Sequence, residues 1–215
     1  MISEIFGLFK DGVIGIILIF YKYFNDLTLA IIVFTLVLKI LTLPFSFLSF
    51  VEEKKIKKLQ PKIKEIFKKY KGDIIKQNEE LNKIYRQENY KPLLSIFYQL
   101  IPMFIIIVVL TAFNNIIKMP NINKISFNFL NLSQKNVFLF IILLITQLLT
   151  IREMNKDQRK IFLGIFILIA FVLYNFPAII QIYLITYFSL SLIEKYLFNF
   201  YYIKKPVTPI PKNNP

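Results

Sequence analysis

One lysine lies in the middle of an apolar run and is flanked by hydroxyl residues at helical spacing. Lys39 is near the centre of residues 27–51, where a lysine on a spanning helix costs about 2.5 to 3.5 kcal/mol to insert. Thr35, Thr42 and Ser46 share its face of a helix. Such a stripe is typical of residues that line a substrate or ion pathway inside a membrane.

A simpler interpretation has the lysine reaching out to the membrane surface while the hydroxyls bond their own helix. From mid-span, however, the ammonium must travel roughly 10 to 15 Å to leave the apolar layer, which is more than a lysine stem spans. The other predicted spans contain no Asp or Glu. We therefore expect Lys39 to have no ion-pair partner in the membrane and to lie in a positive, hydrated cavity.

Cysteine and histidine are both absent from the 215 residues. Their absence removes disulfides, thiol nucleophiles, imidazole bases and most transition-metal sites. We therefore expect no enzyme chemistry and no cofactor. The net charge of +14 is carried by loops between apolar runs, a pattern that indicates anionic lipid as a partner and not nucleic acid as a specific ligand.

The elements that must position Lys39 are membrane helices, because 56% of the residues are hydrophobic and the mean hydropathy is +0.56. Spanning a bilayer takes about 20 apolar residues. The sequence predicts five spans, at residues 27–51, 92–113 and 137–151 and in two halves of 161–193 divided at Asn175, Phe176 and Pro177.

Residues 1–26 are harder to place, because their longest clean apolar run is too short to span. We expect an uncleaved helix in the membrane interface, with a sixth span as the alternative and no signal peptide. Residues 27–202 form the predicted five-helix core, and residues 203–215 a short, basic, proline-rich cytoplasmic tail.

The loop charges predict the orientation. Residues 52–91 hold twelve Lys and one Arg against seven acidic residues, and apolar residues recur there at helical spacing on both sides of Gly72. This pattern predicts a cytoplasmic amphipathic hairpin, either a spacer held near anionic lipid or a docking element. The expected fold is an all-α integral membrane protein, a five-helix bundle with its N-terminus outside and its C-terminus inside.

Several segments resemble the YidC/Oxa/Alb family of membrane protein insertases. LTLAIIVFTLVLKILTLPFS is similar to the family's first core helix, with Lys39 followed by Pro44. The resemblance continues in order through four further segments: KKLQPKIKEIFKKYKGD, KPLLSIFYQLIPMF, FNFLNLSQKN and NFPAIIQIYL.

The resemblance implies a function without bond chemistry. The protein would receive hydrophilic segments of nascent membrane proteins in a groove and release their helices sideways into lipid, in the bacterial cytoplasmic (inner) membrane, alone or with the Sec translocon. It implies groove roles for Lys39, at the position of the family's arginine, for Thr35, and for Tyr183 in the last helix. Lysine in place of arginine keeps the charge but loses the planar donor fork. The tail implies at most weak ribosome contact.

Two other functions fit the residues. A small anion transporter or channel would bind its anion at Lys39, although no internal repeat is evident in the sequence. A passive membrane scaffold would present the basic hairpin to partners, and it would then not need Lys39.

Overall fold

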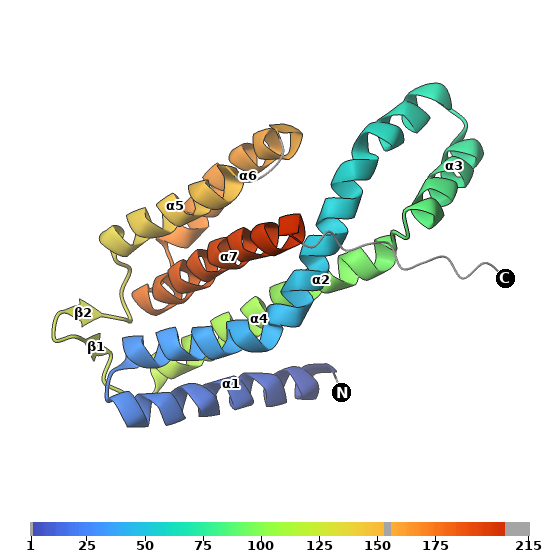
Figure 1. Cartoon of the computed structure of the whole chain (residues 1–215). Coiled ribbons are helices and arrows are strands. Elements are labelled where there is room, and N and C mark those ends of the chain that lie inside the picture. The colour runs from blue at the N-terminus through green and yellow to red at the C-terminus, as the bar shows by residue number, and fades with distance from the viewer. Residues whose placement is uncertain (1, 153–155, 205–215) are drawn as a thin grey trace. The chain divides into compact units, whose positions relative to one another are not determined.

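The computed structural model describes residues 2–152 and 156–204 (Figure 1). Seven helices make up most of this part of the chain, and their bounds are α1 Ile2–Phe24, α2 Leu27–Lys69, α3 Ile74–Gln87, α4 Pro92–Lys118, α5 Val137–Arg152, α6 Lys156–Tyr174 and α7 Ala178–Lys204. The only strands in it are β1 Ile125–Ser126 and β2 Leu130–Asn131, an antiparallel pair in the loop before α5. The predicted all-α fold therefore needs this small correction.

Three of these helices, α2, α4 and α7, are long and apolar enough to cross a membrane. Helix α5 and the segment Phe162–Tyr174 of α6 are apolar but shorter. Helices α2, α4 and α5 begin at Leu27, Pro92 and Val137, where the predicted spans begin, and α7 begins after the predicted break, at Ala178. As helices, α2 and α7 extend beyond the predicted spans, because both continue past their apolar runs into charged sequence.

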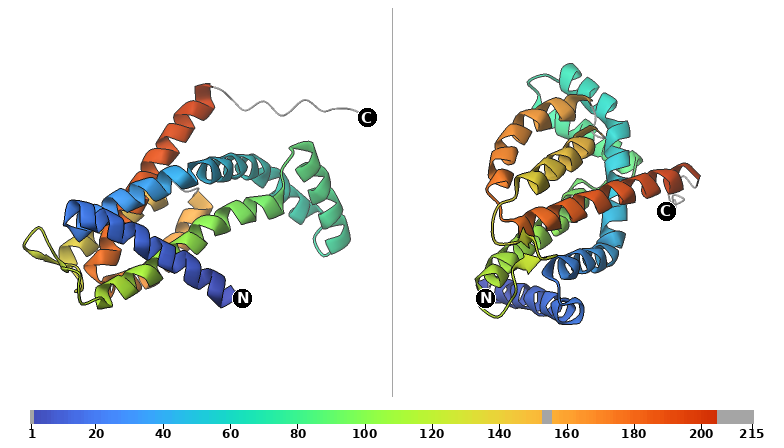
Figure 2. Two further views of the ribbon diagram at one scale, coloured as in Figure 1. Left: turned by 90° about the horizontal axis from the view of Figure 1, so that it is seen from below. Right: turned by 90° about the vertical axis from the view of Figure 1, so that its left-hand side faces the viewer.

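The chain folds as two compact units. The described parts of Met1–Leu41 and Phe104–Glu194 form the first unit, and those of Thr42–Met103 and Lys195–Pro215 form the second. Helix α5 and helix α6, both in the first unit, lie side by side and antiparallel in both views (Figures 1 and 2).

Apolar side chains from most helices of the first unit meet in one core. Helix α1 contributes Ile14 and Ile17, and its Phe6 and Phe9 rings contact Phe104 of α4 edge to face. Phe113 of α4 packs against Tyr183 of α7 with ring centroids 5.4 Å apart. Burial of such aromatic rings dominates the packing energy of a helix bundle, so this core fixes α7 beside α4.

In the second unit, α2 and α3 are joined by a tight turn and run antiparallel (Figure 1). Gly72 has φ +91°, a conformation that favours glycine. Asp73 caps α3 by accepting a hydrogen bond from the Lys76 amide at 3.0 Å. Aromatic contacts of Phe47 with Phe198 and Tyr201 join α2 to the end of α7.

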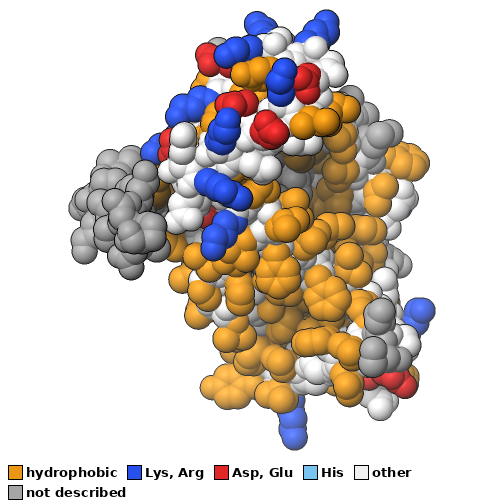
Figure 3. Space-filling view, turned by 90° about the vertical axis from the view of Figure 1, so that its right-hand side faces the viewer, with side chains coloured by type: hydrophobic (Ala, Val, Ile, Leu, Met, Phe, Trp, Pro, Cys, Tyr) orange, Lys and Arg blue, Asp and Glu red, His pale blue; other side chains and the backbone are white. Residues whose placement is uncertain are grey.

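Side-chain types are segregated on the molecular surface. On the face shown in Figure 3, Lys and Arg side chains gather in one region and hydrophobic side chains cover a broad area elsewhere. Many large apolar side chains are exposed, among them Leu93 of α4 and Phe138 of α5. An exposed apolar surface of this extent is the surface that a bilayer covers.

Candidate functional site

Lys39 lies inside the first unit and is held by α7. Its ammonium donates hydrogen bonds to Glu194 Oε2 and Ser191 Oγ, both at 2.7 Å. The ammonium also lies 4.2 Å from the centroid of the Tyr187 ring. We call Lys39, Tyr187, Ser191 and Glu194 the Lys39 site.

Helical periodicity and an anchored helix start place the α7 residues of this site. Tyr183, Tyr187, Ser191 and Glu194 recur at helical spacing and so share one face of α7. The first turn of α7 is fixed by the loop between β2 and α5, because the amides of Ala178 and Ile179 donate to the carbonyls of Gln134 and Leu132. These bonds satisfy amides that a helix start leaves unpaired.

The ion pair within the site is almost covered by protein. The side chains of Lys39 and Glu194 are only 7% and 13% exposed. Taking two such charges out of water costs several kcal/mol for each ion, and this cost is offset only by good pairing geometry and additional hydrogen bonds. The serine hydroxyl and the aromatic face of Tyr187 supply these additional contacts.

The prediction that Lys39 has no ion-pair partner is therefore wrong. It rested on ending the last span at Ile193, whereas α7 continues through Glu194 to Lys204. The charge of the lysine is compensated by the carboxylate, so the site is not a bare positive centre.

A sequence profile of the 60Kd inner membrane protein family matches residues 19–205. The chain belongs to this family. It is the family of the YidC/Oxa insertases, which the sequence segments resemble.

Relatives with the name membrane protein insertase YidC are similar to most of the chain. The protein from Endomicrobium trichonymphae is 27% identical over 204 residues, and that from Caldanaerobacter subterraneus is 27% identical over 183 residues. The alignments cover 89% and 83% of this chain, and 39% and 87% of the two relatives. The chain thus spans about two fifths of the first relative's length and most of the second's.

A solved structure shares the fold. It is titled "Active YidC insertase crystal structure with the first transmembrane domain resolved" and is 22% identical, with a TM-score of 0.62. The match covers 87% of this chain and 45% of that one. The helix arrangement of this YidC/Oxa family member is therefore one already seen in an experimental structure.

The residues that the sequence singles out lie in different surroundings. Thr35 is fully buried one turn before Lys39, and its hydroxyl donates to the Ile31 carbonyl at 2.6 Å. This is the self-bonding that the simpler interpretation expects. Tyr183 is also fully buried and lies beside Tyr187, with ring centroids 5.9 Å apart. Thr35 and Tyr183 thus belong to the first unit with Lys39.

Thr42 and Ser46 lie on the continuation of α2 in the second unit. Both are half-buried, whereas the neighbouring Leu41 and Leu43 are exposed. The hydroxyl face of α2 therefore continues to be the more covered face of the helix in this stretch.

Three residues of the Lys39 site were missed from the sequence: Tyr187, Ser191 and Glu194. The signal was present, because these side chains and Tyr183 form a polar stripe on α7 like the stripe on α2. A helix wheel drawn across the charged boundary at Glu194 would have found it. Within the described residues, no group of three or more His, Cys, Asp or Glu side chains could hold a metal ion.

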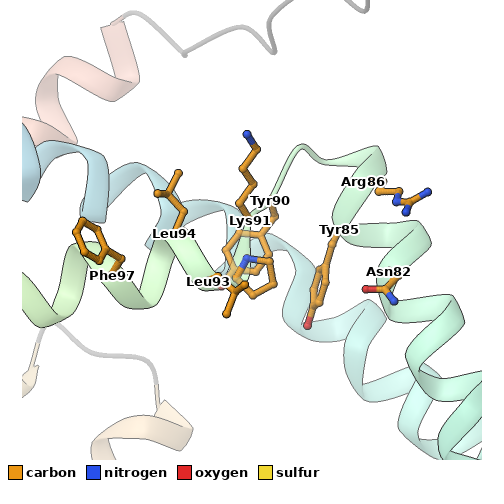
Figure 4. A pocket seen from close by; sticks show the side chains of 9 residues that line it. Asn82, Tyr85, Arg86, Tyr90, Lys91, Leu93, Leu94 and Phe97 are labelled. Atoms are coloured by element: carbon orange, nitrogen blue, oxygen red, sulfur yellow. The ribbon is translucent and has the colours of Figure 1, made fainter.

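A hollow of about 600 Å³ lies where α3 is followed by α4 in the second unit (Figure 4). Tyr85, Tyr90, Leu93 and Phe97 are among its lining residues. The ammonium of Lys91 points away from Tyr85 and Leu93 (Figure 4). The polar groups that line this hollow do not converge on one point, so the Lys39 site is the stronger candidate for the functional site.

Asp26, just before α2, ties this helix to the β1–β2 loop. Its carboxylate accepts hydrogen bonds from the Ser126 hydroxyl at 2.7 and 2.6 Å and from the amides of Leu29 and Phe127 at 3.1 Å. Partial burial raises the pKa of Asp26, but these hydrogen bonds outweigh it and leave the pKa below its ordinary value. The carboxylate is therefore a structural anion at neutral pH.

Proposed function

We propose that this chain is a membrane protein insertase that receives hydrophilic segments of nascent membrane proteins at the Lys39 site. The observation that carries the proposal is a lysine buried within a bundle of membrane-competent helices and held by polar groups of α7. A charged group at membrane depth is costly and marks a functional site by default. Membership of the YidC/Oxa family supports nascent membrane proteins as the substrate class of this site.

In this function the protein acts by lowering a barrier and catalyses no bond chemistry. The lysine attracts acidic or polar side chains of the substrate. This attraction lowers the free-energy cost of moving those side chains out of water. The proposed substrate contacts are Thr35 and Tyr183 in the first unit and Thr42 and Ser46 on the same face of α2, and the substrate's apolar helix leaves sideways into lipid. No cofactor is required.

The proposed setting is the bacterial cytoplasmic membrane, with five spanning helices. The basic α2–α3 hairpin faces the cytoplasm and its anionic lipids. The Sec translocon and the ribosome are proposed partners.

Insertion of a single-span substrate into proteoliposomes tests this proposal. Lys39→Glu would place a second carboxylate against Glu194. Two carboxylates in contact repel by more than about 1.4 kcal/mol, so we expect insertion to fall by about tenfold or more. Lys39→Arg keeps the charge and should retain most activity. Lys57→Glu, which makes the same charge change at a lysine paired with Glu53, is the matched control.

Photocrosslinking gives a second readout. Probes at Thr42 and Ser46 should capture the nascent substrate, whereas a probe at Lys57 should not. Equal insertion by the Lys39→Glu variant would contradict the role of the charge. Anion flux in liposomes without insertion would favour an anion transporter, and loss of function only on deleting the hairpin would favour a scaffold.

A further inference from the structure

The ammonium of Lys39 already has a carboxylate bound to it. Glu194 and Ser191 each accept a hydrogen bond from it at 2.7 Å, and the ring of Tyr187 covers another side. An ammonium has only three protons to donate. An acidic substrate side chain therefore meets a cation whose best contact is taken.

We propose that Glu194 is an internal competitor that holds Lys39 until an acidic side chain of the incoming segment replaces it. This inference rests on the proposed function and names the chemical class that the site selects. The substrate group is a carboxylate, the same group as that of Glu194, so it can make the same charge-assisted contact.

Exchange of one carboxylate for another avoids an uncompensated buried charge. Breaking a buried ion pair by removing one partner typically costs several kcal/mol, because the remaining charge stays in a medium of low dielectric. In an exchange the lysine remains paired at the start and at the end. Glu194 is the more exposed of the two partners, at 13% against 7%, so it is the partner that can turn outward to water.

The same contact discriminates against neutral segments. An amide or hydroxyl side chain offers the lysine a weaker bond than a carboxylate does, so it cannot displace Glu194 at comparable cost. A neutral segment therefore leaves the resting pair in place, and Glu194 sets how much of the lysine's attraction for an acidic segment appears as binding affinity.

A binding assay on the full-length protein in lipid nanodiscs tests the proposal. The probes are two fluorescent single-span peptides that differ only in their hydrophilic N-terminal segment, one with two aspartates and the other with two asparagines. Glu194→Gln removes the competing charge with little change in shape. We expect it to bind the aspartate peptide about tenfold more tightly, in line with the coupling of close charge pairs, and the asparagine peptide unchanged.

Glu53→Gln is the matched control, because it removes a carboxylate paired with Lys57 on the same helix as Lys39. It should change neither affinity. Glu194→Asp keeps the charge but shortens the side chain by one methylene, and it should give an intermediate gain for the aspartate peptide alone.

Equal affinities of the wild type and Glu194→Gln for the aspartate peptide would overturn the proposal. So would an equal loss for both peptides, or failure of both Glu194 variants to assemble, since Glu194 would then be a structural requirement that no substrate could replace. Failure of the proposed function is read separately, from the absence of insertion by the wild type in proteoliposomes.

Discussion

At the scale of single residues, two charged side chains, one buried and one anchoring a loop, each have polar or oppositely charged partners that compensate the charge. Lys39 is compensated by Glu194, and Asp26 by the Ser126 hydroxyl and two amides. The position of the lysine was predictable, because a charge within an apolar run is visible in the sequence. Its partner was not, because Glu194 comes just after the apolar run, where a span chosen by hydropathy ends.

The Asp26 anchor predicts a pH-dependent stability. Because its folded-state pKa lies below the ordinary value of 3.8, the carboxylate stabilises the fold fully above that pH, and the stabilisation is lost as the pH falls through the folded-state value. With allowance for solvent screening, Asp26→Asn should lower the thermal midpoint at pH 7 by about 2 to 4 °C, as expected for about 1 kcal/mol. The difference should shrink towards pH 3.

Circular dichroism melting in detergent micelles from pH 7 to pH 3 measures this effect. Asp11→Asn is the control, because the Asp11 side chain is 69% exposed and its pair with Lys10 is worth little. A destabilisation by Asp26→Asn that stays constant across this pH range would show that the carboxylate charge is not its cause.

At the scale of elements, the starts of the helices were predicted better than their ends. Residues such as Pro92 and Pro177 give local signals, since proline is favoured at or just before the first turn of a helix, where its missing amide proton is not needed. The ends of α2 and α7 lack such signals, because backbone hydrogen bonding continues when the side chains change from apolar to charged. The two-residue strands β1 and β2 are too short to leave a pattern in the sequence.

Two glycine substitutions, one in the α2–α3 turn and one in α1, should have opposite effects on local stability. Gly72 has a positive φ, so Gly72→Ala should destabilise the turn by about 1 kcal/mol. Gly15 is exposed within α1 and an added Cβ would meet nothing within 4 Å, so Gly15→Ala should stabilise α1 by about 0.5 to 1 kcal/mol.

Hydrogen exchange resolved by segment measures both effects. Gly72→Ala should speed exchange in α3 and leave α1 unchanged, and Gly15→Ala should slow it in α1 alone. Faster exchange in α1 as well as in α3 with Gly72→Ala would indicate a general loss of stability instead of a local turn effect.

At the scale of the whole molecule, composition and loop charge predict a membrane protein, and the family match agrees. The number of spans does not follow from the helices alone, because α5 and the apolar part of α6 are shorter than a usual span. The orientation depends on the unequal distribution of Lys and Arg among the loops.

Single cysteines test this topology, and the absence of native cysteine makes each label unique. In intact cells an impermeant maleimide should label Asn128→Cys, in the predicted outer loop, and should label Lys71→Cys, in the predicted cytoplasmic turn, only after permeabilisation. Labelling of Ser3→Cys from outside would place α1 in the interface, whereas its protection would make α1 a sixth span. The reverse result at positions 71 and 128 would contradict the predicted orientation.

The pairing of Lys39 with Glu194 also has an electrical consequence. A transmembrane voltage does work on net charge, about 2.3 kcal/mol for each elementary charge moved through 100 mV. One cation and one anion 2.7 Å apart sum to zero, so the field exerts almost no net force on the resting pair. After a substrate carboxylate has replaced Glu194, the new pair with Lys39 is again neutral, so the membrane potential acts on the released Glu194 carboxylate and on any further charges that the substrate carries.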